Sequence, residues 1–118
     1  MNIGNFELCL NVKDITKTTD FYKTMGFEST TYKPEEGVSI LKREGLTVSL
    51  YKGWISENML NFRGGDVFKI SEQLASKGLS LEVDANIESD GSQGATLRDP
   101  DGNLIYFNTS PGEEVKPN

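Results

Sequence analysis

The sequence contains no histidine and only one cysteine, Cys9. Without histidine, Ser-His-Asp and Cys-His nucleophilic sites cannot form, and zinc or iron sites that use imidazole ligands are excluded. A single thiol cannot hold an iron–sulfur cluster or form a disulfide within the chain. The chemistry that remains is that of carboxylate, Tyr, Lys or Arg side chains, an oxygen site for a hard metal, or binding without catalysis.

Basic residues are also few, because 12 Lys and Arg stand against 18 Asp and Glu, giving a net charge of −6. This balance argues against nucleic-acid binding, since a phosphate backbone attracts basic surfaces, and it weakly favours a cationic ligand. No apolar run approaches the length of a membrane span, and no secretory signal is recognised. We therefore expect one domain with no membrane partner, located in the cytoplasm, where a single cysteine stays reduced.

Two stretches of the chain resemble each other at an offset of 52 residues. LCLNVKDITKTTDFYKTMGF begins at residue 8, and LNFRGGDVFKISEQLASKGL begins at residue 60. Each has an aspartate, Asp14 or Asp66, where a helix should begin and where a carboxylate can accept the N–H groups of the first turn. Each ends in a glycine, Gly26 or Gly78, which can adopt the left-handed conformation that stops a helix. The repeat predicts two similar modules.

Each module is expected to open with a strand and a helix and to continue with three strands. The helices are predicted over 15–25 and 67–77, the first with Ile15, Phe21, Tyr22 and Met25 on its buried face. Strand-like runs follow at 27–33, 38–43 and 47–52, and then at 79–83, 95–98 and 104–108. The modules are placed at about 1–53 and 58–110, and the polar tail 111–118 is expected to be flexible.

The segment RDPDGNLIYFN at 98–108 combines a turn with a strand. Asp99-Pro100-Asp101-Gly102-Asn103 has the residues that turns prefer, and the glycine comes too early for a calcium-binding loop. Along the strand that follows, Ile105 and Phe107 point to one face while Tyr106 and Asn108 point to the other. If the first face is core, the Tyr106 side is free for another role.

LNVKDITKTTDFYKTMGF and LRDPDGNLIYF resemble the first strand and helix and the last hairpin of the vicinal oxygen chelate superfamily. That superfamily includes glyoxalase I, extradiol dioxygenases and the fosfomycin and bleomycin resistance proteins. The resemblance covers nearly the whole chain. It implies an α+β fold in which tandem βαβββ modules form a curved, cup-like mixed sheet, a fold that supports many different activities.

In metal-using members of the superfamily, ligands point into the cup from the first and last strands of each module. The resemblance places Glu7, Met59 and Tyr106 at three of these positions, and the fourth falls near Thr47 or Ser49. Only Glu7 keeps a ligand type, and one carboxylate cannot complete a zinc or iron site. We therefore expect neither a metal nor another cofactor.

Alternation along four strands marks the same face independently, because polar or amphipathic residues alternate there with apolar ones. Such a face is either exposed to solvent, as in many antiparallel sheets, or lines a ligand-binding cup inside a curved sheet, which the resemblance favours. Trp54 lies outside these strands and suits either a dimer contact or a lid. The candidate ligand-binding residues are Glu7, Cys9, Ser49, Tyr51, Trp54, Met59, Asn61, Tyr106 and Asn108.

Two functions fit these residues, beside a domain without any ligand. The first is a non-metal small-molecule binding protein similar to the bleomycin resistance proteins, which implies a homodimer and a cationic or aromatic ligand. Glu7 would supply the charge, and Tyr51, Trp54 and Tyr106 would supply stacking area. The second is a metal-free or weakly metal-dependent lyase, isomerase or dioxygenase-like enzyme with Glu7 as its base.

Overall fold

The computed structural model describes residues 1–117, which divide into two compact units. We call Glu7–Met59 the N-terminal unit, and residues 1–6 together with 60–117 the C-terminal unit. Strand β1 (Asn5–Asn11) begins in the C-terminal unit and continues in the N-terminal one. The tail expected at 111–118 ends at residue 118, which lies outside the described residues.

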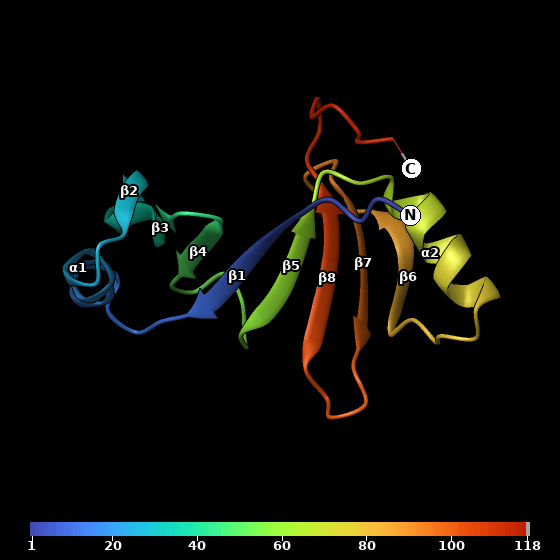
Figure 1. Ribbon diagram of the computed structural model, residues 1–118, viewed down its shortest axis with the longest axis horizontal. Helices are drawn as coiled ribbons and strands as arrows, with labels where there is room; N and C mark the ends of the chain where they lie inside the picture. Colours follow the sequence, from blue (N-terminus) through green and yellow to red (C-terminus); the bar gives the residue numbers. More distant parts are fainter. Residues whose placement is uncertain (118) are drawn as a thin grey trace. The chain divides into compact units, whose positions relative to one another are not determined.

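The N-terminal unit is one βαβββ module. After β1 come α1 (Ile15–Thr24), β2 (Glu28–Lys33), the short 3₁₀ helix η1 (Pro34–Glu36), β3 (Val38–Arg43) and β4 (Leu46–Tyr51). The strands lie in the order β2-β3-β4-β1, and β1 runs parallel to β4 while the other neighbours are antiparallel (Figure 1). Helix α1 therefore crosses over between parallel strands and covers one face of the sheet.

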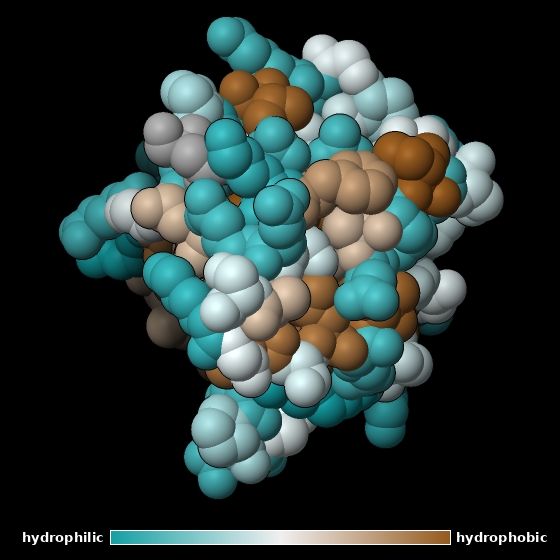
Figure 2. All heavy atoms as spheres, turned by 90° about the vertical axis from the view of Figure 1, so that its right-hand side faces the viewer, coloured by the Kyte–Doolittle hydropathy of each residue, from teal (hydrophilic) through white to brown (hydrophobic). Residues whose placement is uncertain are grey.

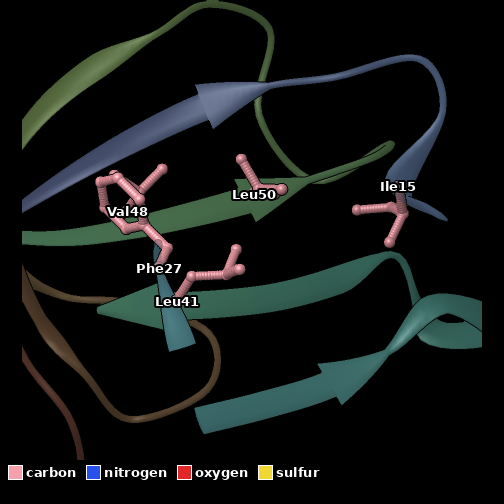
Figure 3. Packing of buried hydrophobic residues seen from close by; sticks show 5 residues of the cluster. All are labelled: Ile15, Phe27, Leu41, Val48 and Leu50. Atoms are coloured by element: carbon pink, nitrogen blue, oxygen red, sulfur yellow. The ribbon is translucent and has the colours of Figure 1, made fainter. Parts of the chain in front are cut away.

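Apolar side chains fill the space between α1 and this sheet. Ile15 from the helix meets Leu41 from β3 and Val48 and Leu50 from β4, and Phe27 closes the cluster after the helix ends (Figure 3). All five residues are buried. The alternate positions on β4, which include Ser49 and Tyr51, consequently point to the other face of the sheet.

The C-terminal unit repeats this arrangement with β5 (Met59–Arg63), whose first residue still belongs to the N-terminal unit. It continues with α2 (Val67–Ser76), β6 (Val83–Ile87), β7 (Gln93–Arg98) and β8 (Leu104–Thr109). Its strands lie in the order β5-β8-β7-β6, with β5 parallel to β8 (Figure 1). The core beneath α2 consists of Val67, Ile70, Ala95, Leu97 and Phe107. The predicted α+β class with tandem βαβββ modules is thus confirmed.

The predicted helix boundaries are confirmed as well. The Asp14 carboxylate accepts a hydrogen bond from the Lys17 backbone N–H at 3.0 Å, and the Asp66 carboxylate accepts one from the Lys69 N–H at 3.2 Å. At the other ends, Gly26 and Gly78 have φ values of 97° and 91°, a conformation that favours glycine. The similar caps explain why the two stretches of sequence match.

The predicted buried face of α1 is partly wrong. Phe21 and Met25 are 61% and 53% exposed, whereas Thr19 is buried and its hydroxyl lies 2.8 Å from the Ser39 hydroxyl. Positions 15, 19 and 22 recur at helical spacing and meet the sheet, and position 21 falls outside that stripe. A paired hydroxyl therefore occupies a place where we expected an apolar side chain.

The strand predicted at 79–83 is also wrong, because the strand is β6, Val83–Ile87. The Leu79 N–H still bonds to the Leu74 carbonyl at the end of α2, and Leu81 packs into the core. Pairing with β7 begins at the Glu82 N–H, which donates to the Thr96 carbonyl. The position of β7 therefore sets where this strand starts. Neither α-helix within the described chain has the length and apolar character needed to cross a membrane.

Candidate functional site

Four of the predicted site residues lie on the face of the N-terminal sheet that points away from α1. Cys9 on β1 is the register partner of Ser49 on β4, and both side chains are buried. Glu7 and Tyr51 lie on the same face, opposite Thr47 and Asn11, and are partly buried. The alternation seen in the sequence therefore gathers these four residues on one surface.

Trp54 lies outside this surface. It follows β4, is 67% exposed, and donates from its indole Nε1 to the Glu36 carbonyl at 2.8 Å. Together with residues 34–37, 52 and 53 it lines a surface hollow of about 420 Å³. Within the N-terminal unit, Trp54 is thus a neighbour of η1.

In the C-terminal unit, the predicted residues lie on the face opposite α2. Asn61 on β5 is the register partner of Tyr106 on β8, and Met59 precedes Asn61 by two positions on the same strand. Ile105 packs against the core beneath α2, so Tyr106 points to the other side, as its alternation predicts. We call this surface the Tyr106 face and define it by Asn61, Arg63, Gly94, Tyr106 and Asn108.

The carboxylate that meets Tyr106 on this face, Glu88, is not among the residues predicted from the sequence. The Tyr106 hydroxyl donates to Oε1 of Glu88 at 2.5 Å, and both side chains are partly buried. Glu88 directly follows β6, where a tight turn forms because its N–H donates to the Ser92 carbonyl and its own carbonyl accepts from the Gly91 N–H. This turn holds the carboxylate at the end of the β6–β7 hairpin. A hydrogen bond from a phenol to a carboxylate is charge-assisted and therefore short.

Gly94 on β7 makes room for the Glu88 carboxylate. A Cβ at position 94 would lie 2.5 Å from Glu88 Oε2, closer than real Cβ contacts come. Gly94 is buried and is the register partner of Asn108. The glycine therefore allows the carboxylate to lie close against the sheet.

Asn108 occupies the middle of a row of three strands, with Gly94 on one side and Arg63 on the other. Its Oδ1 atom is buried and has no hydrogen-bond partner within residues 1–117. A buried acceptor without a donor is costly, and it is satisfied when a ligand supplies an N–H or O–H group. The Tyr106 face thus carries two hydrogen-bond acceptors, Asn108 Oδ1 and the Glu88 carboxylate.

The charges on this face suit a hydrogen-bond donor. Glu88 forms no ion pair within the described chain, so its carboxylate charge is compensated only by the hydroxyl of Tyr106 and by solvent. Residues 1–117 also contain no group of three His, Cys, Asp or Glu side chains that could hold a metal ion. The Tyr106 face therefore offers acceptors for an organic molecule with N–H groups.

The chain matches known proteins in its three-dimensional structure and not in its sequence. No protein-family profile matches the chain, and no curated protein sequence does. The structure, however, matches solved structures at low sequence identity, and the three described below are covered over nearly their whole length.

A structure described as a NAD-dependent benzaldehyde dehydrogenase from Legionella pneumophila has 18% identity and a TM-score of 0.74, covering 89% of this chain and 98% of its own. A glyoxalase/bleomycin resistance protein/dioxygenase superfamily member from Vibrio splendidus 12B01 has 19% identity and a TM-score of 0.64, with coverage of 90% and 98%. A methylmalonyl-CoA epimerase in complex with methylmalonyl-CoA and NH4+ has 22% identity and a TM-score of 0.58, with 98% of each chain covered. The protein therefore has the fold of the vicinal oxygen chelate superfamily.

Proposed function

We propose that this protein binds a small organic molecule that carries a cationic amine, without using a metal, and that the Tyr106 face holds it. The observation that supports this proposal is the hydrogen bond of 2.5 Å between Tyr106 and Glu88. One oxygen of the carboxylate accepts from the phenol, and the other lies over Gly94. An ammonium group gains a charge-assisted hydrogen bond there, and the ring of Tyr106 offers an aromatic face beside it.

Benzylamine tests the proposal directly because it combines a cationic amine with one aromatic ring, and benzyl alcohol is its neutral counterpart. We expect benzylamine to bind more tightly than benzyl alcohol. The Glu88→Gln variant should weaken benzylamine by about 1–3 kcal/mol, or roughly 5- to 150-fold, the usual loss for a charge-assisted hydrogen bond. Binding of benzyl alcohol should be almost unchanged.

Glu72→Gln is the matched control, since Glu72 is an exposed glutamate on α2, on the opposite side of the same sheet. This variant should bind benzylamine like the original protein. Equal binding of benzylamine and benzyl alcohol, or equal loss in the Glu72 and Glu88 variants, would contradict the proposal.

A second function is favoured by the same short distance. A phenol that is hydrogen-bonded to a carboxylate can pass a proton to or from a bound substrate, so Glu88 and Tyr106 would serve an isomerase or lyase better than Glu7 alone. Methylmalonyl-CoA, which one structural neighbour holds, is a suitable probe. Deuterium uptake from D2O into this compound that is catalysed by the protein and lost in Glu88→Gln would favour an enzyme. Uptake at the uncatalysed rate would favour binding alone.

The proposal also includes a homodimer. The edge strand β6 exposes Val83 and Ile87 at 48% and 60%, and edge strands with apolar side chains are commonly covered by a second chain. Figure 2, which views the side of the chain that carries α2 and β6, shows hydrophobic atoms exposed between polar ones. Light scattering should give the mass of a dimer at micromolar concentration, and a monomer there would contradict this part.

The absence of a tightly bound metal is the remaining part of the proposal. The three predicted positions offer a carboxylate, a thioether and a phenol, from Glu7, Met59 and Tyr106, and no single divalent metal prefers that mixture of hard and soft ligands. Elemental analysis of protein washed with chelator should find no stoichiometric zinc, iron or manganese. One equivalent of any of these metals would overturn it.

A further inference from the structure

The tail after β8 folds back onto the loop between β5 and α2. The Lys116 N–H donates to the Gly64 carbonyl at 2.7 Å, and Lys116 forms a parallel bridge with Gly65. Three residues earlier, the Glu113 side chain reaches Arg63 on β5. The tail therefore places a carboxylate at the edge of the Tyr106 face.

The contacts of Glu113 are those of a bound carboxylate. The Arg63 Nε donates to both carboxylate oxygens, at 3.2 and 3.3 Å, and the Ser110 backbone N–H donates to Oε1 at 2.9 Å. The Arg63 Nη2 donates to the Ser110 hydroxyl at 2.9 Å, which fixes the plane of the guanidinium. An arginine held in this way recognises a carboxylate through several directed N–H groups, which a lysine cannot do.

This internal ion pair is easily replaced. The side chains of Arg63 and Glu113 are 37% and 26% exposed, and ion pairs in contact with water contribute little to stability. Glu113 also stands on a tail that follows the last strand of the unit. A carboxylate from another molecule can therefore take its place at small cost.

Arg63 lies in the same row as the carboxylate of the proposed binding site. Its register partner is Asn108, whose partner on the next strand is Gly94, the residue beneath Glu88. Neighbouring strands are about 4.8 Å apart, so the backbones of Arg63 and Gly94 are separated by roughly 10 Å. One row of the Tyr106 face thus presents a cation at one end, a carboxylate at the other and an amide between them.

We infer that Arg63 and Ser110 form a carboxylate-binding site, which Glu113 occupies in the free protein and which the carboxylate of a zwitterionic ligand takes over. This inference rests on the proposed function, because Glu88 supplies the site for the amine of the same ligand. The chemical class is a small amino acid-like molecule whose amine and carboxylate are separated by a spacer.

Three related probes separate the two ends of this site: benzylamine, benzoate and 4-(aminomethyl)benzoate. Titrations followed by ¹⁵N–¹H NMR should show benzoate shifting the amides of Arg63, Ser110 and Glu113, and benzylamine shifting those near Glu88. The compound with both charges should shift both sets and bind more tightly than either single-charge probe. Inorganic phosphate, added separately, should compete weakly, because the arrangement of donors fits a planar carboxylate.

The decisive variant is Glu113→Gln, which removes the internal carboxylate without touching the sheet. It should tighten benzoate and 4-(aminomethyl)benzoate by about two- to fivefold, since an exposed ion pair no longer competes, and leave benzylamine unchanged. Glu114→Gln is the matched control, because Glu114 is the exposed neighbour of Glu113 in the sequence and the ion pair with Arg63 is made by Glu113. This variant should bind all three probes like the original protein. Arg63→Lys keeps the charge and should still lose most of the benzoate response.

The outcomes distinguish this inference from the proposed function. If benzylamine binds through Glu88 but benzoate causes no shift at Arg63 up to tens of millimolar, the carboxylate site is wrong and the proposed function stands. If benzoate binds equally in the original protein, Glu113→Gln and Arg63→Lys, the inference is overturned as well. If benzylamine does not bind while benzoate responds to Glu113→Gln as expected, the anion site is supported and the proposed amine site fails.

Discussion

The Glu88 carboxylate lies against the backbone of Gly94, so close that a Cβ on that glycine would come within 2.5 Å of Oε2 and 2.6 Å of Cδ. The same carboxylate accepts a hydrogen bond from the hydroxyl of Tyr106. The position of the acid on the Tyr106 face thus depends on the absence of a side chain at residue 94. A methyl group added at residue 94 would change the position of the carboxylate without changing its charge.

Gly94→Ala should therefore displace Glu88 from Tyr106 while keeping both side chains. We expect benzylamine binding to weaken by about fivefold or more, because a hydrogen bond of roughly 1 kcal/mol is lost from the site. Unfolding in urea should change little, since the group that must move is the end of a flexible side chain. Gly45→Ala is the control, because a Cβ at position 45 meets nothing within 4 Å. Unchanged binding in Gly94→Ala would contradict this role of the glycine.

The two capping aspartates allow a stability prediction for each unit. Asp14→Ala and Asp66→Ala should each lower the free energy of unfolding by about 1 kcal/mol, the usual loss for an N-cap, as measured by urea denaturation. Asp20→Ala, in the middle of α1, should be nearly neutral. Two silent capping variants would show that these carboxylates do not stabilise the helix starts.

The turn between β7 and β8 should respond to acid. Hydrogen bonds from the Asn103 side chain, and then from the backbone N–H groups of Asn103 and Asp101, lower the pKa of Asp99 below its ordinary value of 3.8. A lowered pKa in the folded state means that the stabilisation is complete above the unfolded-state pKa and is lost as the pH falls through the folded-state pKa. We therefore expect the turn to loosen only below about pH 4.

Carboxyl-detected NMR titration measures this pKa directly. In Asn103→Ala, the pKa of Asp99 should move back up toward its ordinary value, because the largest cause of the shift is removed. A pKa of Asp99 at or above the ordinary value in the unmodified protein would contradict the observed hydrogen bonds.

Glu7, the carboxylate expected from the sequence to supply charge, gives a separate prediction. Glu7 belongs to the N-terminal unit, and Glu7→Gln should weaken the binding of benzylamine to that unit by about 1–3 kcal/mol and leave the fold intact. Glu28→Gln, an exposed glutamate on β2 of the same unit, should have no effect. Calorimetric titration with benzylamine that finds Glu7→Gln indistinguishable from Glu28→Gln would show that Glu7 supplies no charge for this ligand.

Local signals explain how far the fold could be predicted from the sequence. The repeated module could be predicted because its helix ends depend on a few neighbouring residues. These are the capping residues Asp14 and Asp66 and the glycines that end both helices. The start of β6 could not be predicted from the sequence. Apolar and polar residues alternate through the whole segment LSLEVDANI, so only the hydrogen bonds to β7 decide where the strand begins. Tertiary pairing overrides local preference in such a strand.

Glu88 was missed for a related reason. It lies between the strands that we predicted at 79–83 and 95–98, in a segment where Ser89-Asp90-Gly91-Ser92 has the composition of a tight turn. Placing a hairpin turn there would have put Glu88 at the end of one strand and Gly94 near the start of the next. Its contact with Tyr106, which comes 18 residues later, still required the order of the strands in the sheet.

The central claim is that an amine-bearing ligand lies on the Tyr106 face. Measurement of intermolecular NOEs between the ligand and the protein tests this claim most directly. With benzylamine bound, we predict NOEs between the methylene protons of the ligand and the ring protons of Tyr106, and none to Ile105, which packs beneath α2 on the other side of the same strand. The NOEs should vanish in Glu88→Gln at the same ligand concentration. NOEs to Ile105, or to Trp54 with none to Tyr106, would contradict the account.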